Sequence, residues 1–209
     1  MIAEDIAVRP ATAQDLPAIA DTLAEAFHDY AWMRWTVAAG DHTRRVRALQ
    51  LYFTERIGLP HGRVWVAGGH GAVNAVSVWT TPATVVPAEL FTAPELAELH
   101  GDRAAQAHAA DQAVAPYRPV TPAWFLATIG VRRGHQGRGL GGAVLRPGLA
   151  EADREGRPVY LETASESNVR FYRRYGFEVT AETDVPDGGP HAWCMTRPAR
   201  APGPEGAGR

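Results

Sequence analysis

The clearest change between apolar and polar character lies in the second half of the chain. An apolar run from Trp124 to Val131 is too short for an ordinary helix, and it therefore predicts a buried strand. A polar turn, a glycine-rich stretch at residues 136–142 and a helical pattern that includes Val144 and Leu149 follow it. This order predicts an anion site, because the first amides of a helix have no partner within the helix and glycines let a phosphate approach them.

The remaining pattern predicts further strands and helices around this unit. Strands are predicted at residues 6–9, 63–67, 72–80, 159–164, 177–185 and 191–197, with a hairpin turn at 68–71. Helices are predicted at residues 12–27, 41–58, 93–100, 102–115 and 167–175, with an aromatic-rich loop at 28–40. Pro147 and Gly148 predict a kink or an early end in the helix that follows the glycines.

Length and composition limit the class of protein. The 209 residues, 45% of them hydrophobic, suffice for one core, so we expect a single domain over residues 1–197 and a disordered tail at 198–209. A net charge of −2 without a basic stripe argues against a nucleic-acid or membrane-surface partner. The single cysteine, Cys194, fits a reducing compartment. No signal peptide or membrane-spanning run is recognisable, so a soluble, cytoplasmic protein is expected.

The absence of lysine excludes several chemistries. All 21 basic side chains are arginine, which rules out a phosphate-loop ATPase and a pyridoxal or Schiff-base enzyme, since each needs a lysine. The sequence also contains neither G-x-S-x-G nor H-E-x-x-H. Serine-hydrolase and zinc-protease functions therefore lack their usual motifs.

The glycine-rich stretch allows three interpretations. Gly137, Gly139 and Gly142 satisfy the dinucleotide fingerprint G-x-G-x-x-G, which by itself is a weak signal. Gln136, Gly139 and Gly141 instead satisfy Q-x-x-G-x-G, which resembles the acyl-coenzyme A signature of the GCN5-related N-acetyltransferases (GNATs). The third interpretation is a glycine-rich turn that only lets a helix and a strand pack closely.

A second motif favours the acetyltransferase interpretation. Residues 168–177, NVRFYRRYGF, resemble the N-x-x-x-F-Y-x-x-x-G-F segment of the same family and follow the first motif in the right order. The resemblance extends from about Val8 to Arg197. It is strongest to the members that acetylate the aminonucleoside puromycin, through the segments WTTP (79–82), APYRP (115–119), WFLATIGV (124–131), HQGRGLG (135–141), LET (161–163) and WCMTR (193–197).

The resemblance implies a fold and a cosubstrate. The fold is α/β (α+β), the GNAT fold, with a mixed and mostly antiparallel central sheet flanked by helices. The strands of Ile129 and Leu161 are expected to splay apart and leave a slot for a thioester. The cosubstrate is acetyl-coenzyme A, with no metal. The residues expected to bind it are Ile129, Gly130, Val131, Gln136, Gly137, Arg138, Gly139, Leu140, Gly141, Gly142, Asn168 and Tyr172.

The resemblance also implies catalytic roles. Tyr172 is expected to be the general acid for the departing thiolate, although its helical spacing alone would fit a core aromatic. Glu162 is expected to be the base through a water that Thr128 could anchor; the competing interpretation is a solvated or salt-bridged strand residue. Side chains expected to line the acceptor pocket are Tyr30, Trp35, Trp79, Phe91, Trp124, Thr128 and Glu162.

Three functions follow from these features. The first is transfer of acetyl to the primary amine of puromycin or a related aminonucleoside, which would confer antibiotic resistance. The second keeps the chemistry and changes the acceptor to another small amine or a peptide N-terminus. The third is a non-catalytic acyl-coenzyme A sensor. In each case the partner is a small molecule, and the protein is expected to be a monomer or homodimer.

Overall fold

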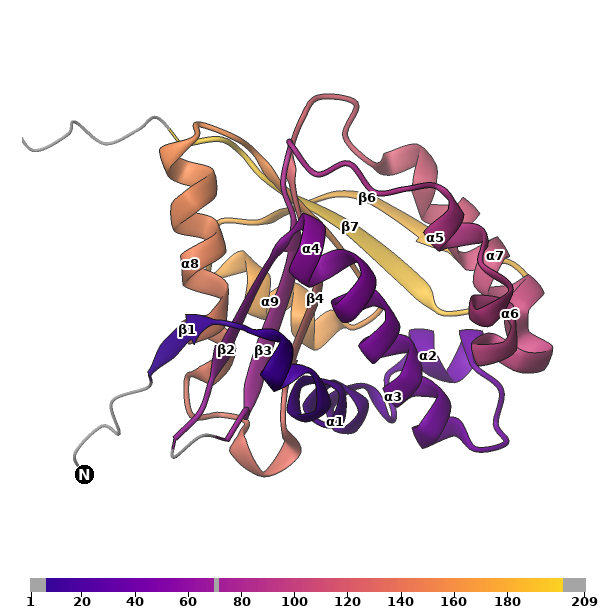
Figure 1. The fold of residues 1–209 in the computed structure, drawn as a ribbon. Helices are drawn as coiled ribbons and strands as arrows, with labels where there is room; N and C mark the ends of the chain where they lie inside the picture. The colour runs from indigo at the N-terminus through magenta and orange to yellow at the C-terminus, as the bar shows by residue number, and fades with distance from the viewer. Residues whose placement is uncertain (1–6, 70–71, 201–209) are drawn as a thin grey trace, which may run out of the picture.

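A seven-stranded sheet forms the centre of the protein. The computed structural model describes residues 7–69 and 72–200, and the strands lie in the order β1-β2-β3-β4-β5-β7-β6 (Figure 1). Their bounds are β1 Val8–Pro10, β2 Arg63–Ala67, β3 Ala75–Thr80, β4 Trp124–Val131, β5 Val159–Thr163, β6 Glu178–Asp184 and β7 His191–Arg197. All neighbouring strands are antiparallel except β4 and β5. The sheet is therefore mixed and mostly antiparallel, as predicted.

Helices cover both faces of this sheet. The α-helices are α1 Leu16–Phe27, α2 Ala31–Thr36, α3 His42–Phe53, α4 Leu59–His61, α5 Glu89–Thr92, α6 Pro94–His100, α7 Ala104–Val114, α8 Leu140–Arg154 and α9 Glu166–Arg173. The short helices are η1 Ala13–Asp15, η2 Thr54–Gly58 (a π-helix), η3 Gly101–Arg103, η4 Ala115–Tyr117 and η5 Arg133–His135. In Figure 1, α2, α5, α6 and α7 gather at the end of the molecule away from α8.

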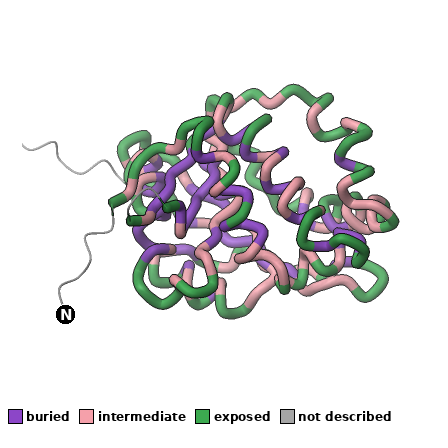
Figure 2. The backbone as a smooth tube through the Cα atoms, turned by 60° about the horizontal axis from the view of Figure 1, so that its bottom comes forward, coloured by how far each residue is buried: buried purple, intermediate pink, exposed green. Residues whose placement is uncertain are grey.

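Alternation along the strands divides the core into two layers. Val64, Val66, Val76 and Val78 pack against Ile19 and Leu23 of α1. The intervening side chains, which include Trp65 and Trp79, pack against α8 and α9 on the other face. Figure 2 shows the buried positions concentrated in the strands and on the inner sides of these helices. A period of two along the strands thus fills both layers.

Most predicted elements are confirmed, one predicted loop is wrong, and of the kink or early end expected at Pro147 the early end is contradicted. The loop predicted at residues 28–40 contains the helix α2, whose short length and aromatic side chains give no clear helical period. The central helix does not end at Pro147 but continues to Arg154. Gly148 permits this packing, since a Cβ there would lie 2.5 Å from the ring of Trp79.

Some predictions fall partly outside the described residues. These are the start of the first strand at Ile6, the turn at residues 70–71 and residues 201–209 of the predicted tail.

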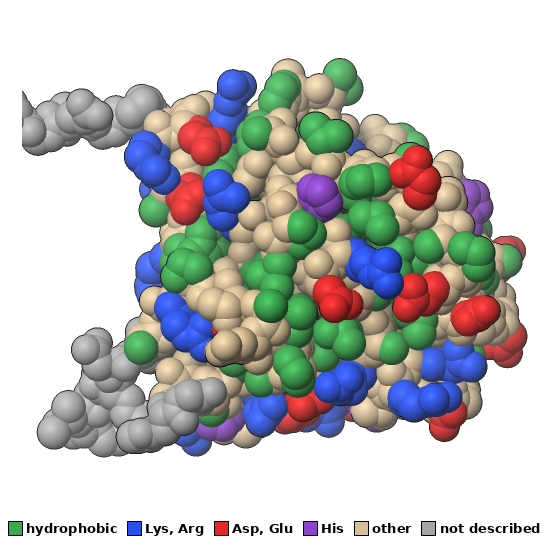
Figure 3. Space-filling model, viewed as in Figure 1, with side chains coloured by type: hydrophobic (Ala, Val, Ile, Leu, Met, Phe, Trp, Pro, Cys, Tyr) green, Lys and Arg blue, Asp and Glu red, His purple; other side chains and the backbone are tan. Residues whose placement is uncertain are grey.

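On the face drawn in Figure 3, arginine and acidic side chains are interspersed. Among the helices of the described chain, none combines the length and apolar character that a membrane span requires.

Candidate active site

The turn between β4 and α8 exposes a row of backbone amides. Gly137 and Gly139 adopt φ of 75° and 84°, in the left-handed region that glycine tolerates best. The amide of Ala143 donates to the Gly139 carbonyl at 2.9 Å and is the first in α8 to donate within the helix. The amides of residues 138–142, just before it, make no recorded hydrogen bond within the described chain. They are donors available to an anion at a helix N-terminus.

Two further contacts fix the shape of this turn. Gln136 donates from Nε2 to the carbonyl of Val131 at 3.2 Å, which closes the turn as predicted. A Cβ at Gly142 would overlap the Tyr175 hydroxyl, whereas one at Gly141 would make ordinary contacts of 3.5 Å. Gly142 therefore serves the packing of α8 against the segment after α9. The glycines of the turn and the unpaired amides of residues 138–142 together fit an anionic group such as the pyrophosphate of coenzyme A.

Strands β4 and β5 separate soon after they meet. They pair only at Trp124–Val159 and Phe125–Tyr160, and no later rung is recorded among the described residues. A bulge in β4 opposite Val78 and Trp79 leaves Ala127 outside the register with β3. The β5-facing edge of residues 126–131 is therefore without a strand partner, which is the predicted splay and includes Ile129, Gly130 and Val131.

Tyr172 of α9 lies in the core beside this gap. Its side chain is 5% exposed and packs with Leu161 and Phe177. No hydrogen bond of its hydroxyl is recorded within the described residues. Burial, and secondarily the neighbouring Tyr30, raises the pKa of Tyr172 well above its ordinary value. The phenol is therefore protonated throughout the physiological range and its proton is not committed to a protein acceptor.

Tyr30 reaches the end of β5 from the segment between α1 and α2. Its hydroxyl accepts a hydrogen bond from the Ala164 amide at 2.6 Å and lies 3.1 Å from Thr163 Oγ1. Asn168, expected to contact the pantetheine arm, donates to the same Thr163 oxygen at 3.1 Å. Tyr30 and Asn168 are thus joined through Thr163 close to Tyr172. The Tyr30 hydroxyl binds the protein here, so only its ring is available as a pocket wall.

Glu162 is ion-paired in this structure. Arg118 donates to its carboxylate from Nε at 2.8 Å and from Nη2 at 3.3 Å, and the Tyr160 hydroxyl donates at 3.2 Å. Arg118 also donates to Asp111 at 2.7 Å. Burial disfavours the charged form of Arg118 and by itself would lower the pKa of the guanidinium. The hydrogen bonds and negative charges of Glu162 and Asp111 have the larger combined effect, so the pKa is raised. Both interpretations that the sequence left open for Glu162, ion pair and base, remain compatible with its position beside the gap.

A pocket of about 320 Å³ adjoins this ion pair. Its walls include Pro82, Pro119, Phe125 and Tyr160, and Arg118 lies at its edge. The rings of Phe125 and Tyr160 lie 5.7 Å apart, centroid to centroid. The pocket therefore offers flat, apolar surfaces next to a carboxylate.

The predicted aromatic wall is wrong in part. Trp79 and Trp124 are 0% exposed and pack on each other, with ring centroids 6.1 Å apart, so they belong to the core. Phe91 on α5 is 57% exposed and Trp35 packs beside Arg103, and neither lines the pocket described above. Thr128 is half-buried on β4, beyond the bulge. The aromatic side chains that do line the pocket, Phe125 and Tyr160, lie in strands and gave no separate signal in the sequence.

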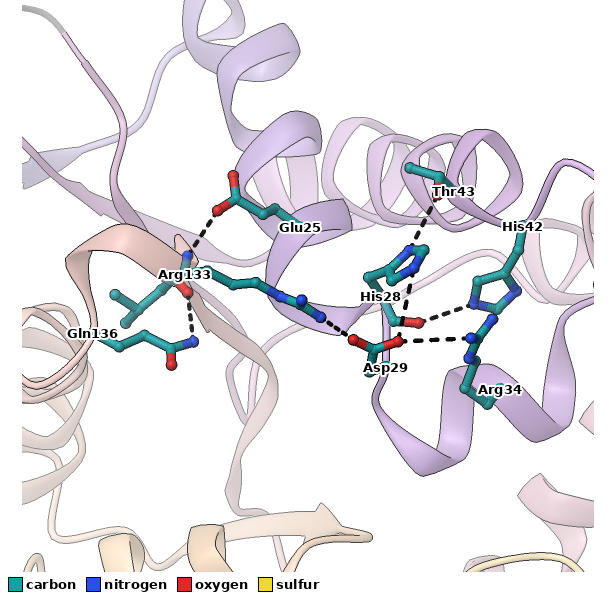
Figure 4. A network of polar contacts seen from close by, with 9 residues as sticks. Glu25, His28, Asp29, Arg34, His42, Thr43, Arg133 and Gln136 are labelled. Atoms are coloured by element: carbon teal, nitrogen blue, oxygen red, sulfur yellow. Dashed lines mark hydrogen bonds and ion pairs between the residues drawn. The ribbon is translucent and has the colours of Figure 1, made fainter.

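A polar network that no sequence motif indicated joins the turn between β4 and α8 to α1 (Figure 4). Glu25 accepts a hydrogen bond from the Arg133 amide at 2.8 Å, and the Arg133 guanidinium is ion-paired with Asp29. Asp29 directly precedes Tyr30. The glycine-rich turn is therefore held to the same segment that positions the Tyr30 hydroxyl.

The chain matches a known family of proteins. A family model described as the acetyltransferase (GNAT) domain matches residues 60–179, which is more than half of the chain. The chain belongs to the GNAT acetyltransferase family. Residues 60–179 therefore form a GNAT acetyltransferase domain, and members of this family use acetyl-coenzyme A.

Individual relatives differ in how much they share. A mycothiol acetyltransferase from Streptomyces scabiei is 37% identical over 102 residues, which are 47% of this chain and 30% of that protein. The chain therefore spans less than a third of that relative. A solved structure described as histone acetyltransferase HPA2 and related acetyltransferase from Corynebacterium glutamicum has a TM-score of 0.75 and 28% identity, covering 95% of this chain and 99% of its own. The ribosomal-protein-S18-alanine N-acetyltransferase of Escherichia coli has a TM-score of 0.56 at 16% identity, covering 96% of this chain and 97% of its own, and shares the fold.

Proposed function

We propose that this acetyltransferase transfers acetyl from acetyl-coenzyme A to the primary amine of puromycin or a closely related aminonucleoside. One observation carries the choice of acceptor. The segments 79–82, 115–119 and 124–131, which resemble puromycin N-acetyltransferase in sequence, each contribute lining residues to the same pocket, among them Thr81, Arg118 and Phe125. Puromycin carries a methoxyphenyl ring and a dimethyladenine, two flat apolar groups that suit walls of proline and aromatic side chains.

The cosubstrate would be held by groups already described. The amides of residues 138–142 would bind its pyrophosphate, with Gln136 closing the turn, and the unpaired edge of β4 and Asn168 would bind the pantetheine arm. When bound, acetyl-coenzyme A supplies an acetyl group activated as a thioester. Holding amine and thioester in line can contribute about 7–11 kcal/mol to lowering the barrier.

The protein would handle two protons. The α-amino group of an aminoacyl nucleoside has a pKa near ~7.7–8.0, so part of it is neutral at pH 7. Glu162 would receive the remaining amine proton directly or through a water near Thr128. Tyr172 would donate its hydroxyl proton to the departing sulfur. Its raised pKa and the absence of a recorded hydrogen bond from its hydroxyl in the described chain support this role. The two groups project from neighbouring elements beside the gap between β4 and β5.

The test is release of thiol from acetyl-coenzyme A with and without puromycin. Puromycin-dependent release with kcat/KM of about 10⁴ M⁻¹s⁻¹ or more is the expected result. Release only with other amines, such as agmatine or a peptide N-terminus, would refute the acceptor and retain the chemistry. Tight coenzyme A binding without release for any amine would instead favour the acyl-coenzyme A sensor.

A further inference from the structure

Arg118 lies between two carboxylates at the edge of the candidate acceptor pocket. Its guanidinium donates to both oxygens of Glu162, at 2.8 and 3.3 Å, and to Asp111 at 2.7 Å. The Tyr160 hydroxyl also donates a hydrogen bond to the Glu162 carboxylate. The Glu162 side chain is only 14% exposed. A cation with several N–H donors thus already occupies the place where an acceptor amine would need to meet this carboxylate.

The three charged groups differ in how firmly they are held. Glu162 belongs to the sheet strand β5, and Asp111 belongs to the three-turn helix α7. Arg118 comes from residues 116–122, all of which are exposed and which include three prolines. Its own side chain is 39% exposed, and its backbone amide makes one hydrogen bond, to Ala115 at 3.2 Å. Arg118 is therefore the member that can leave while the two carboxylates stay in place.

We propose that Arg118 is a specificity-determining plug, whose guanidinium fills a cation site formed by Glu162 and Asp111 until the acceptor's ammonium displaces it. The inference rests on the proposed function in one respect, that Glu162 faces the acceptor. Exchange of one monocation for another leaves the net charge of the three-group site unchanged at −1. An uncharged acceptor cannot replace the guanidinium and would leave Glu162 paired. The site therefore selects a protonated primary amine, which releases one proton to solvent before it attacks and then passes its remaining amine proton to the Glu162 carboxylate.

The first test is R118Q, assayed at saturating acetyl-coenzyme A with puromycin as acceptor. A plug that closes the site nine-tenths of the time raises the apparent KM about tenfold, so R118Q should lower the acceptor KM about tenfold. The KM for acetyl-coenzyme A should not change. R118K should behave as the native protein does, because an ammonium also fills the site. R154Q is the matched control, since Arg154 is exposed and no side-chain contact of it is recorded in the described chain.

The second test needs no turnover. Methylguanidinium, at concentrations far below those that denature, should raise the melting temperature of R118Q and compete with puromycin for it, but should do neither to R154Q. The double variant R118Q/E162Q should lose the response. This binding measurement separates the plug from the proposed function, because it works even if no amine is acetylated.

Two results would overturn the proposal. An acceptor KM that rises in R118Q would mean that Arg118 binds the substrate itself. Equal responses of R118Q and R154Q to methylguanidinium would mean that Glu162 and Asp111 form no cation site.

Discussion

At the scale of single residues, the two candidate catalytic groups lie on different sides of the sheet. Tyr172 packs with Leu161 in the layer that α8 and α9 cover. Glu162 is the next residue along β5, and it therefore points to the opposite face, where Tyr160 packs with Cys194. This arrangement keeps the proton donor apart from the proton acceptor, so neither neutralises the other directly.

Replacing Tyr172 by Phe tests the donor. We expect Y172F to lower kcat by about 10²–10⁴-fold while the KM for acetyl-coenzyme A stays similar. Its melting temperature should change little, because the lost hydroxyl has no recorded hydrogen bond in the described part of the chain. Steady-state kinetics and a thermal melt make both measurements. Y117F serves as a control, since Tyr117 is exposed and no hydrogen bond of its hydroxyl is recorded in the described chain. An unchanged kcat in Y172F would remove Tyr172 from the mechanism.

At the scale of elements, the start of α8 is shaped by close packing as well as by backbone conformation. G142A places a methyl group against the Tyr175 hydroxyl, so the ring or the helix must move. We expect G142A to raise the KM for acetyl-coenzyme A, because the helix movement displaces the amides of the turn. Y175F removes the overlapping atom, so the double variant G142A/Y175F should recover part of the loss.

The control for this prediction is G141A, whose new methyl group would have its closest contact, with Phe171 and Val131, at 3.5 Å. It should bind acetyl-coenzyme A more like the native protein. Equal effects of G141A and G142A would show that the fit against Tyr175 does not control the turn.

A second element-scale contact joins β1 to the start of α1. Asp15 accepts hydrogen bonds from Arg9 at 2.6 and 2.7 Å and from the Thr12 amide at 2.8 Å. The Arg9 contacts are the largest cause that lowers the pKa of Asp15 from its ordinary value. The stability that this carboxylate adds is therefore complete above its unfolded pKa of about 3.9 and is lost as the pH falls below that value.

D15N should accordingly lower the free energy of unfolding by about 1–2 kcal/mol at pH 7. The difference from the native protein should shrink at pH 3, because there the Asp15 carboxylate of the unfolded chain is largely protonated whereas that of the folded protein is not. Urea unfolding at both pH values measures it. D187N, an exposed turn position, should show no such pH dependence. A difference that stays constant between pH 7 and pH 3 would contradict the assignment.

At the scale of the whole molecule, one buried arginine connects distant elements. Arg197 of β7, with a side chain only 3% exposed, donates to Asp153 of α8 at 2.7 and 2.8 Å and to the Tyr175 carbonyl at 3.1 Å. It therefore connects the end of the sheet to α8, the helix that begins at the glycine-rich turn. Removing Asp153's charge would leave the guanidinium buried without a counter-ion.

We expect D153N to lower the free energy of unfolding by about 3 kcal/mol, because the remaining charge is poorly solvated. E151Q on the same helix breaks only the more exposed contact to Arg63, at 3.6 Å, and should cost at most about 1 kcal/mol. Urea unfolding compares the two. Similar losses in the free energy of unfolding of D153N and E151Q would show that water solvates the Arg197–Asp153 ion pair.

The sequence by itself determined most of the elements and the position of the glycine-rich turn. The short apolar run of β4, the glycines that need positive φ and the aromatic spacing in α9 are local constraints, and local constraints can be recognised within a short window. The membership of the GNAT family follows from the same two motifs. These features were predicted because each depends on residues that are neighbours in the chain.

The tertiary structure alone decided which side chains meet at the acceptor side. Arg118 and Glu162 are 44 residues apart, and Tyr30 and Ala164 are 134 apart, so no periodicity links them. The same limit explains why Trp79 and Trp124 were expected in the pocket. Aromatic type gives the apolar area of a side chain, but burial is set by the bulge in β4 and by the packing of α8, which place both tryptophans in the core. The chemistry of this protein can therefore be predicted from local motifs. The acceptor selectivity proposed for it depends on contacts that only folding brings together.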